Sequence, residues 1–258
     1  MTRWKLFALV IMVTLVGAPL LRASTDCYST ITGTKGPNAI SYCITANGNV
    51  LQMKGEGLSQ EGNFEGYEVQ VVDPFGGSNS RYYDYGVSSF GFNAPVIFQP
   101  NGPNTFPLKI TRTSIADVSI TLEQTFRKDT SDPSILLIDM KVTIFRDWPR
   151  VHIDIVRAAD ITADQDPANT VQSVGSRSIL SSKPGGHGVL LSTLSTVDDF
   201  TETWLEDCSI AAHVPSASGT ATCATYRMLL PHRVVDPATM CCAAYGASRK
   251  VTFEYKLF

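Results

Sequence analysis

The stretch that decides the fold is residues 106–161, FPLKITRTSIADVSITLEQTFRKDTSDPSILLIDMKVTIFRDWPRVHIDIVRAADI. Apolar and polar side chains alternate along four parts of it, as expected where successive residues of a β-strand point to opposite faces of a sheet. These parts are residues 106–111, 118–126, 136–145 and 151–156. The connections between them are short and polar, which favours antiparallel neighbours. The stretch therefore predicts four consecutive strands at the centre of an all-β domain.

Shorter segments with strand character flank this centre, and Asn47-Gly48 between two of them is typical of a type I′ hairpin turn. No segment has a sustained apolar stripe with a period of 3.6 residues, so little helix is expected. Single all-β domains often run to about 200–250 residues. We therefore expect one domain over residues 24–258, a large antiparallel β-sandwich of supersandwich-like size.

The first 23 residues have the pattern of an export signal. Basic residues lie near the start, an apolar run follows at residues 6–16, and residues 21–23 (Leu-Arg-Ala) approximate a cleavage site. The apolar run is too short to span a bilayer. The alternative is an anchor that is not cleaved. The sequence predicts a signal peptide over residues 1–23, a secreted or periplasmic protein, and no membrane span after cleavage.

The charge balance of the chain argues against two classes of partner. The whole chain has 21 basic and 24 acidic residues, a net charge of −3. Removal of residues 1–23 takes away Arg3, Lys5 and Arg22 and no acid, which leaves a net charge of −6. No segment of the sequence concentrates basic residues. Nucleic acid and anionic membranes are therefore poor partners for this chain.

Six cysteines follow the predicted signal peptide, and an even number in an exported chain indicates disulfides. Cys208 and Cys223 flank a loop of small residues, which suits a local bridge. The adjacent Cys241 and Cys242 are too close to bond readily to each other. One pattern pairs them with Cys27 and Cys43 and so ties the chain ends together. The competing pattern has a local Cys27–Cys43 bridge.

An acidic loop follows the last central strand. Asp160, Asp164, Asp166 and Asn169 lie within ten residues of one another. Clustered carboxylate and amide oxygens are suitable ligands for Ca²⁺, although the spacing is not that of an EF-hand. The alternative is a solvated acidic loop without an ion.

A second candidate group lies on the last central strand. His152 and Asp154 are two residues apart and share a face, so they are suited to acid–base chemistry in a groove, with Arg157 nearby. The alternative is a polar outer face of the sheet, paired across strands with residues such as Asp139 and Lys141.

A third candidate group is the segment Arg81-Tyr82-Tyr83-Asp84-Tyr85. Flat aromatic rings with polar ends are typical of sugar-binding surfaces, and Arg81, Tyr82, Tyr83 and Tyr85 are the candidate ligand-binding residues. Alternation places Tyr83 and Tyr85 on one face and Tyr82 and Asp84 on the other. The alternative is a tyrosine-rich strand at a sheet edge.

Parts of the chain resemble a set of secreted bacterial β-sandwich proteins of unassigned function. The similarity lies in residues 40–51 (ISYCITANGNVL), 65–67, 82–86, 106–112 (FPLKITR), 121–126 (TLEQTF) and 157–160. It implies a β-sandwich, and it carries no catalytic residues. Sandwiches of this size also look like the supersandwich domains of aldose mutarotases and polysaccharide lyases, which is an analogy of fold alone.

Two functional hypotheses follow. The first is a non-catalytic exported module that binds a glycan or another surface ligand, because G-x-S-x-G and H-E-x-x-H motifs are absent from the sequence. The second is a carbohydrate-active enzyme, mutarotase- or lyase-like, that uses His152, Asp154 and Arg157. The binding-module hypothesis requires no cofactor, and Ca²⁺ is the single ion that the sequence suggests.

Overall fold

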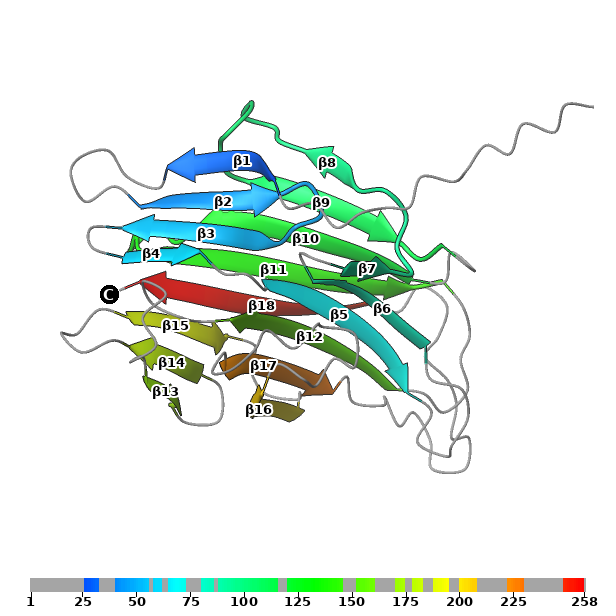
Figure 1. Cartoon of the computed structure of the whole chain (residues 1–258). Coiled ribbons are helices and arrows are strands. Elements are labelled where there is room, and N and C mark those ends of the chain that lie inside the picture. The colour runs from blue at the N-terminus through cyan, green and yellow to red at the C-terminus, as the bar shows by residue number, and fades with distance from the viewer. Residues whose placement is uncertain are drawn as a thin grey trace, which may run out of the picture.

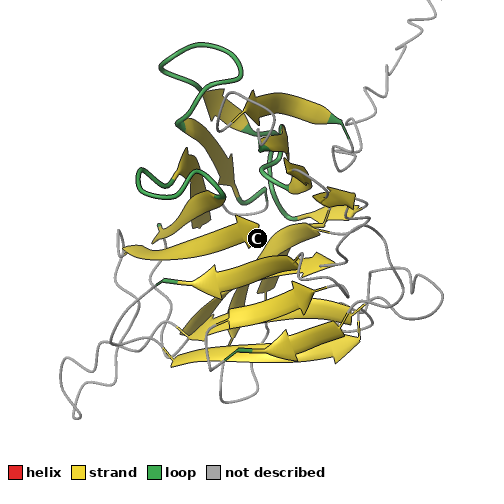
Figure 2. Ribbon diagram, turned by 90° about the vertical axis from the view of Figure 1, so that its left-hand side faces the viewer, coloured by secondary structure: helices red, strands yellow, loops and turns green. Residues whose placement is uncertain are grey.

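The structure, a computed structural model, describes fourteen segments of the chain. They are residues 26–32, 40–55, 58–61, 65–72, 80–85, 88–115, 120–145, 152–160, 170–174, 178–182, 188–194, 200–207, 222–229 and 248–257. These segments contain strands and loops and no helix, as Figure 2 shows. In this described part, accordingly, no helix long and apolar enough to cross a membrane occurs. The predicted all-β antiparallel fold is confirmed.

One layer of the sandwich is an eight-stranded sheet. Its strand order is β13-β14-β15-β18-β11-β10-β9-β8, and each neighbouring pair is antiparallel. The strands are β8 (Val96–Phe98), β9 (Leu108–Thr113), β10 (Ile120–Lys128), β11 (Ile135–Ile144), β13 (Thr170–Ser173), β14 (Ser178–Ser182), β15 (Gly188–Thr193) and β18 (Ser248–Leu257). Burial alternates strictly along β9 and β10, which gives each strand one buried face, mostly apolar but including Arg112 and Gln124, and one partly exposed face.

Two smaller sheets pack against the buried face of the eight-stranded sheet (Figure 1). The six-stranded sheet has the order β16-β17-β12-β5-β6-β7, with strands β5 (Glu65–Val72), β6 (Ser80–Tyr85), β7 (Ser88–Phe90), β12 (His152–Asp160), β16 (Phe200–Asp207) and β17 (Thr222–Leu229). The four-stranded sheet has the order β1-β2-β3-β4, with strands β1 (Cys27–Thr32), β2 (Ser41–Thr45), β3 (Val50–Gly55) and β4 (Leu58–Glu61).

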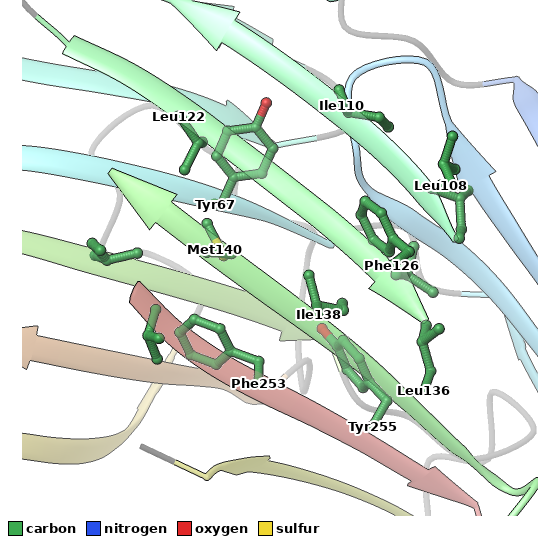
Figure 3. Close-up of a cluster of buried hydrophobic side chains, with 14 of the residues drawn as sticks. Tyr67, Leu108, Ile110, Leu122, Phe126, Leu136, Ile138, Met140, Phe253 and Tyr255 are labelled. Carbon is green, nitrogen blue, oxygen red and sulfur yellow. The ribbon is translucent and has the colours of Figure 1, made fainter. Parts of the chain in front are cut away.

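The three sheets share one hydrophobic core. Figure 3 shows its centre, where aromatic and aliphatic side chains from β9, β10, β11 and β18 gather with Tyr67 of β5. Phe126, Ile138 and Phe253 are among the residues that are fully or almost fully buried there. Burial of each such side chain contributes about 1.5–3 kcal/mol to stability. The core thus accounts for the joining of both smaller sheets to the larger one.

The prediction of four consecutive neighbouring strands is correct for β9, β10 and β11 and wrong for the fourth. Strand β12 lies in the six-stranded sheet, between β5 and β17. The free side of β11 is taken by β18, which pairs with it over residues 135–143. The chain therefore crosses to the opposite layer after β11.

The turn between β2 and β3 also differs from the prediction. A type I′ turn requires positive φ at both central residues, but Gly48 has a φ of 93° and Asn47 has no positive φ. The Gly48 N–H donates to the carbonyl oxygen of Thr45 at 3.1 Å, and the Thr45 N–H donates to that of Asn49 at 2.9 Å. The connection is a three-residue loop that ends in a glycine bulge.

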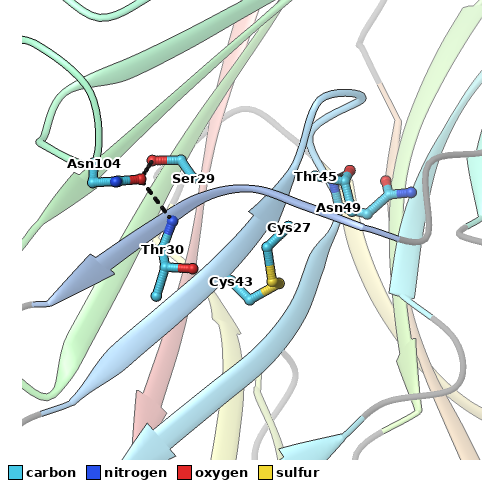
Figure 4. Close-up of a disulfide and its surroundings, with 7 residues drawn as sticks. All are labelled: Cys27, Ser29, Thr30, Cys43, Thr45, Asn49 and Asn104. Atoms are coloured by element: carbon cyan, nitrogen blue, oxygen red, sulfur yellow. Dashed lines mark hydrogen bonds between the residues drawn. A yellow bond between two sulfur atoms is a disulfide. The ribbon is translucent and has the colours of Figure 1, made fainter.

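The disulfide that the structure describes joins Cys27 and Cys43 (Figure 4). The local bridge is thereby confirmed, and the pairing of these two residues with Cys241 and Cys242 is wrong. The reason is strand register, because β1 and β2 are antiparallel neighbours that bring the two Cα atoms to 5.2 Å, within the usual range. Cys223 lies in β17, opposite Glu206.

The remaining cysteines, Cys208, Cys241 and Cys242, lie outside the described residues. Residue 206, the register partner of Cys223, is two positions from Cys208. The Cys27–Cys43 bridge has the same offset, because the register partner of Cys27 is Thr45, which is two positions from Cys43. A Cys208–Cys223 bridge remains a prediction.

A loop closes the sandwich edge where β1 and β8 lie. Asn104 accepts hydrogen bonds through Oδ1 from the Thr30 N–H at 3.0 Å and the Ser29 hydroxyl at 3.2 Å (Figure 4). Gln99 donates to the Ser29 hydroxyl at 3.1 Å. An N–H on the outer edge of β1 therefore has a partner within the chain, as an edge strand requires if it is not to pair with another molecule.

Candidate ligand-binding site

The segment Arg81–Tyr85 forms strand β6, and its side chains divide between the two faces of the six-stranded sheet. Tyr82 and Asp84 are buried, and the Tyr82 ring packs against Phe92 of the core with the ring centroids 5.8 Å apart. Tyr82 is therefore a core residue and not part of an accessible ligand site. Arg81, Tyr83 and Tyr85 are left on the outer face of the sheet.

Three aromatic rings are stacked on this outer face. The Tyr83 ring lies between the rings of Tyr85 and Phe90, with centroid distances of 5.3 Å and 5.8 Å and interplanar angles of 28° and 26°. Phe90 is directly opposite Tyr83 in the pairing of β6 with β7. It is 61% exposed, whereas Tyr85 is buried. The ring stack, defined as Tyr83, Tyr85 and Phe90, is thus open to solvent at the Phe90 end.

A glycine in the neighbouring strand gives Tyr85 room. A Cβ atom on Gly66 would lie 2.1 Å from the carbonyl oxygen of Asp84 and 2.7 Å from Cδ1 of Tyr85. Since Gly66 and Tyr85 are register partners, the tyrosine ring covers the glycine backbone, an arrangement that compensates for the missing side chain. A larger residue at position 66 would displace the base of the ring stack.

Glu68 joins the ring stack to Arg81. The Tyr85 hydroxyl donates to Glu68 Oε2 at 2.6 Å, and burial, followed by the nearby Glu68 charge, raises the pKa of Tyr85 well above its usual value. Arg81 forms a bidentate pair with the same carboxylate, through Nε to Oε1 and through Nη2 to Oε2 at 2.8 Å. Glu68 is 1% exposed. These three residues form a fixed polar border beside the rings.

The Arg81 guanidinium retains donors for a ligand. Its hydrogen bonds with Glu68 chiefly raise the pKa of Arg81, so it is charged at any physiological pH. Of its five N–H groups, two are used by Glu68, and the other three have no partner within the described residues. The side chain is 35% exposed. An exposed aromatic ring and a fixed donor therefore lie on the same strand pair.

The candidate acid–base group on β12 does not form one accessible site. Arg157 is completely buried between the sheets, where it pairs with Glu65 at 2.5 Å. His152 and Asp154 occupy strand positions that alternate with it, and Asp154 is the register partner of Gln70. The side chains of His152 and Asp154 lie outside what the structure describes. Arg157 has a structural environment instead of the accessible position expected of a catalytic group.

Two buried ion pairs, which sequence analysis missed as a group, surround the β2–β3 turn. In the first, Arg112 Nη1 donates to Asp84 Oδ2 at 2.6 Å, and both side chains are fully enclosed. Asp84 also accepts hydrogen bonds from the side-chain amides of Asn47 at 2.8 Å and Asn49 at 2.7 Å. The Arg112 guanidinium lies 5.2 Å from the centre of the Phe92 ring. The charge of Asp84 is thereby balanced inside the core.

In the second pair, Arg157 contacts Glu65 and also donates to Gln124 Oε1 at 2.9 Å and to the carbonyl oxygen of Gly48 at 3.1 Å. Tyr255 donates to Glu65 at 2.9 Å. Burial raises the pKa of Glu65, although the charge of Arg157 opposes this shift. Because these groups are buried and bonded to one another, we assign the network the role of holding the β2–β3 turn in place.

The acidic loop lies largely outside the described residues. Asp160 is the last residue of β12, and Asp164, Asp166 and Asn169 are not described. Within the described part, no group of three or more His, Cys, Asp or Glu side chains is placed to hold a metal ion. The Ca²⁺ site therefore stays a prediction from the sequence.

Comparison with known proteins yielded no match to a family model and none to a curated protein. Among solved structures, the chain is similar to a mutant of the heparan sulfate lyase HepC from Pedobacter heparinus, with a TM-score of 0.49 and 7% sequence identity. The alignment covers 89% of this chain and 35% of the lyase chain. The chain thus spans about a third of the length of that enzyme, and a likeness at this level transfers no activity.

Proposed function

We propose that this protein is a non-catalytic, exported β-sandwich module that binds a glycan through the ring stack. The observation that carries the proposal is the position of Phe90, an exposed aromatic ring that stacks on Tyr83, which in turn stacks on Tyr85, on the sheet face that also carries the donor groups of Arg81. A large exposed aromatic side chain with polar neighbours is typical of a ligand-contacting surface.

The chemistry of a sugar ring suits this arrangement. The C–H groups of a pyranose form an apolar face that packs on an aromatic ring, while the hydroxyl groups at its edge accept hydrogen bonds from N–H donors. Preorganisation lowers the entropic cost of binding. Here Tyr83 is held between two rings and Arg81 is held by Glu68, so little side-chain ordering is required of these groups.

The test is a glycan array followed by calorimetry with any oligosaccharide that binds. We expect Phe90→Ala and Tyr83→Ala each to weaken binding at least tenfold, because each removes part of the stacking surface. Phe98→Ala is the matched control, since Phe98 is also exposed, at 60%, but lies on β8 of the other layer. Equal effects of Phe90→Ala and Phe98→Ala, or no glycan binding at all, would refute the proposal.

The alternative, a carbohydrate-active enzyme that uses His152, Asp154 and Arg157, gains no support from the geometry. It requires the three groups to face one groove, and Arg157 is enclosed in the core. We therefore retain the binding module as the proposed function.

We further propose that the protein is exported to an oxidising compartment, which is secreted or periplasmic. The Cys27–Cys43 disulfide supports this, because such bonds persist in oxidising environments. Mass spectrometry of the protein from its native host should find a mature chain that begins at Ser24 and is two mass units lighter per disulfide. A chain that retains residues 1–23 would contradict the cleavage.

A further inference from the structure

We propose that the ring stack selects neutral, hydroxyl-rich sugars over uronate-containing or sulfated ones, because the cation beside it is already neutralised by Glu68. This inference rests on the proposed glycan-binding function and adds the chemical class of the ligand.

The first step of the argument is the closure of Glu68. Both of its carboxylate oxygens are engaged, one by Arg81 Nε and the other by Arg81 Nη2 and the Tyr85 hydroxyl. The carboxylate is buried on the outer face of the sheet, beside the ring stack. A ligand carboxylate or sulfate cannot replace it without leaving a buried acid unpaired, which is energetically costly.

The second step is the charge of the surroundings. Among the outward-facing positions of β5, β6 and β7, namely residues 66, 68, 70, 72, 81, 83, 85, 88 and 90, the charged residues are Glu68 and Arg81, whose charges cancel. At register positions of the same face, β12 adds His152 and the acidic residues Asp154 and Asp160. The following strand, β17, adds Arg227, whose register partner on β16 is Glu202. An anionic ligand would therefore meet no net positive charge on this part of the sheet.

The third step is what Arg81 can still donate. Its three N–H groups without a partner in the described part can each donate to a hydroxyl oxygen, which needs no counterion. A neutral sugar with its ring on Phe90 gains these hydrogen bonds at no cost to the Arg81–Glu68 pair. Lys141 and Lys250 lie opposite each other in the pairing of β11 with β18. Both belong to the eight-stranded sheet, so neither adds positive charge to the surface around the ring stack.

The experiment compares hexasaccharides of two classes by calorimetry at physiological salt. Neutral probes are gluco-, manno- and galacto-configured hexasaccharides, and anionic probes are oligogalacturonate and heparan sulfate hexasaccharides. We expect a neutral probe to bind at least tenfold more tightly than either anionic probe. Glu68→Gln should narrow this gap at least fivefold, because Arg81 then loses its counterion. Glu123→Gln, which removes an acid paired with two lysines on the other layer, is the matched control.

The outcomes separate the inference from the function on which it rests. Tighter binding of an anionic probe that Phe90→Ala abolishes would overturn the inference and leave the glycan-binding function intact. Failure of every probe to respond to Phe90→Ala would overturn both. If Glu68→Gln does not fold, Arg81→Met provides the test. It should weaken binding of the neutral probe about tenfold because it removes the N–H donors, and weakening of the anionic probe alone would refute neutral selection.

Discussion

The buried pair of Glu65 and Arg157 leads to a quantitative prediction for Glu65→Gln. Three donors converge on the Glu65 carboxylate: Arg157 at 2.5 Å, the Tyr255 hydroxyl at 2.9 Å and the Val50 N–H at 2.6 Å. A glutamine has one acceptor oxygen, so it cannot satisfy all three, and Arg157 is left as a buried charge without a counterion. Breaking a buried pair by removing one partner costs about 3–5 kcal/mol.

The assay is equilibrium unfolding in urea, monitored by tryptophan fluorescence and circular dichroism. We expect the midpoint to fall by an amount that corresponds to about 3–5 kcal/mol at an unchanged m-value. Glu123→Gln is the control, because its partners Lys109 and Lys141 are exposed and such pairs contribute less than about 1 kcal/mol. Addition of Arg157→Met to Glu65→Gln should cost less than the sum of the two single changes, since it removes the unpaired charge.

The result that would refute this reasoning is a loss below about 1 kcal/mol for Glu65→Gln, or full additivity in the double variant. Either would mean that Glu65 and Arg157 do not depend on each other. The β2–β3 turn would then be held mainly by apolar packing, and the buried polar network would contribute little to the joining of the sheets.

Three further predictions concern stability. Gly48→Ala should lower the unfolding midpoint, because its φ of 93° disfavours a side chain and the added Cβ would lie 2.3 Å from the Gln124 amide nitrogen; the urea assay checks it. Hydrogen bonds from Ser134, followed by those from Lys256, lower the pKa of Asp132 to about 2. The Asp132 carboxylate therefore stabilises the fold above its unfolded pKa, near 3.9, and this contribution is lost as the pH falls towards 2. Asp132→Asn should flatten the pH dependence of the melting temperature between these two pH values. Calcium should raise the melting temperature, because bound Ca²⁺ increases the free energy of unfolding by about 2.7 kcal/mol when free Ca²⁺ is in hundredfold excess over its dissociation constant. Asp164→Ala should abolish this effect. A calcium titration that leaves the melting temperature unchanged would favour a solvated acidic loop.

Alternation in the sequence was sufficient to predict strands β9 to β12 and the faces of β6, because period two is a local property of the chain. The same periodicity contains a signal for the buried network. Arg112 is in phase with the buried Leu108 and Ile110, and Arg157 is in phase with Ile155. A charged residue at an inward position predicts a buried partner, since an unpaired charge in a core is too costly.

The identity of the partners is not a local property, and the sequence could not supply it. Glu65 and Arg157 are 92 positions apart, and Gly48 meets Arg157 across 109 positions. Phe90 was missed because it lies in a three-residue edge strand, too short for periodicity to be seen. It becomes part of a site through its register with Tyr83, and register between strands depends on the whole fold.

The position of β18 has a consequence for how the chain acquires its structure. These residues, 248–257, form the strand between β11 and β15, and their Tyr255 bonds to Glu65, 190 positions earlier. During synthesis, the eight-stranded sheet therefore remains divided into two halves with open edges until residues 248–257 emerge. Contacts between segments so distant in the chain slow folding. We expect the nascent chain to depend on chaperones that shield unpaired strands, and a variant that ends at residue 247 to aggregate.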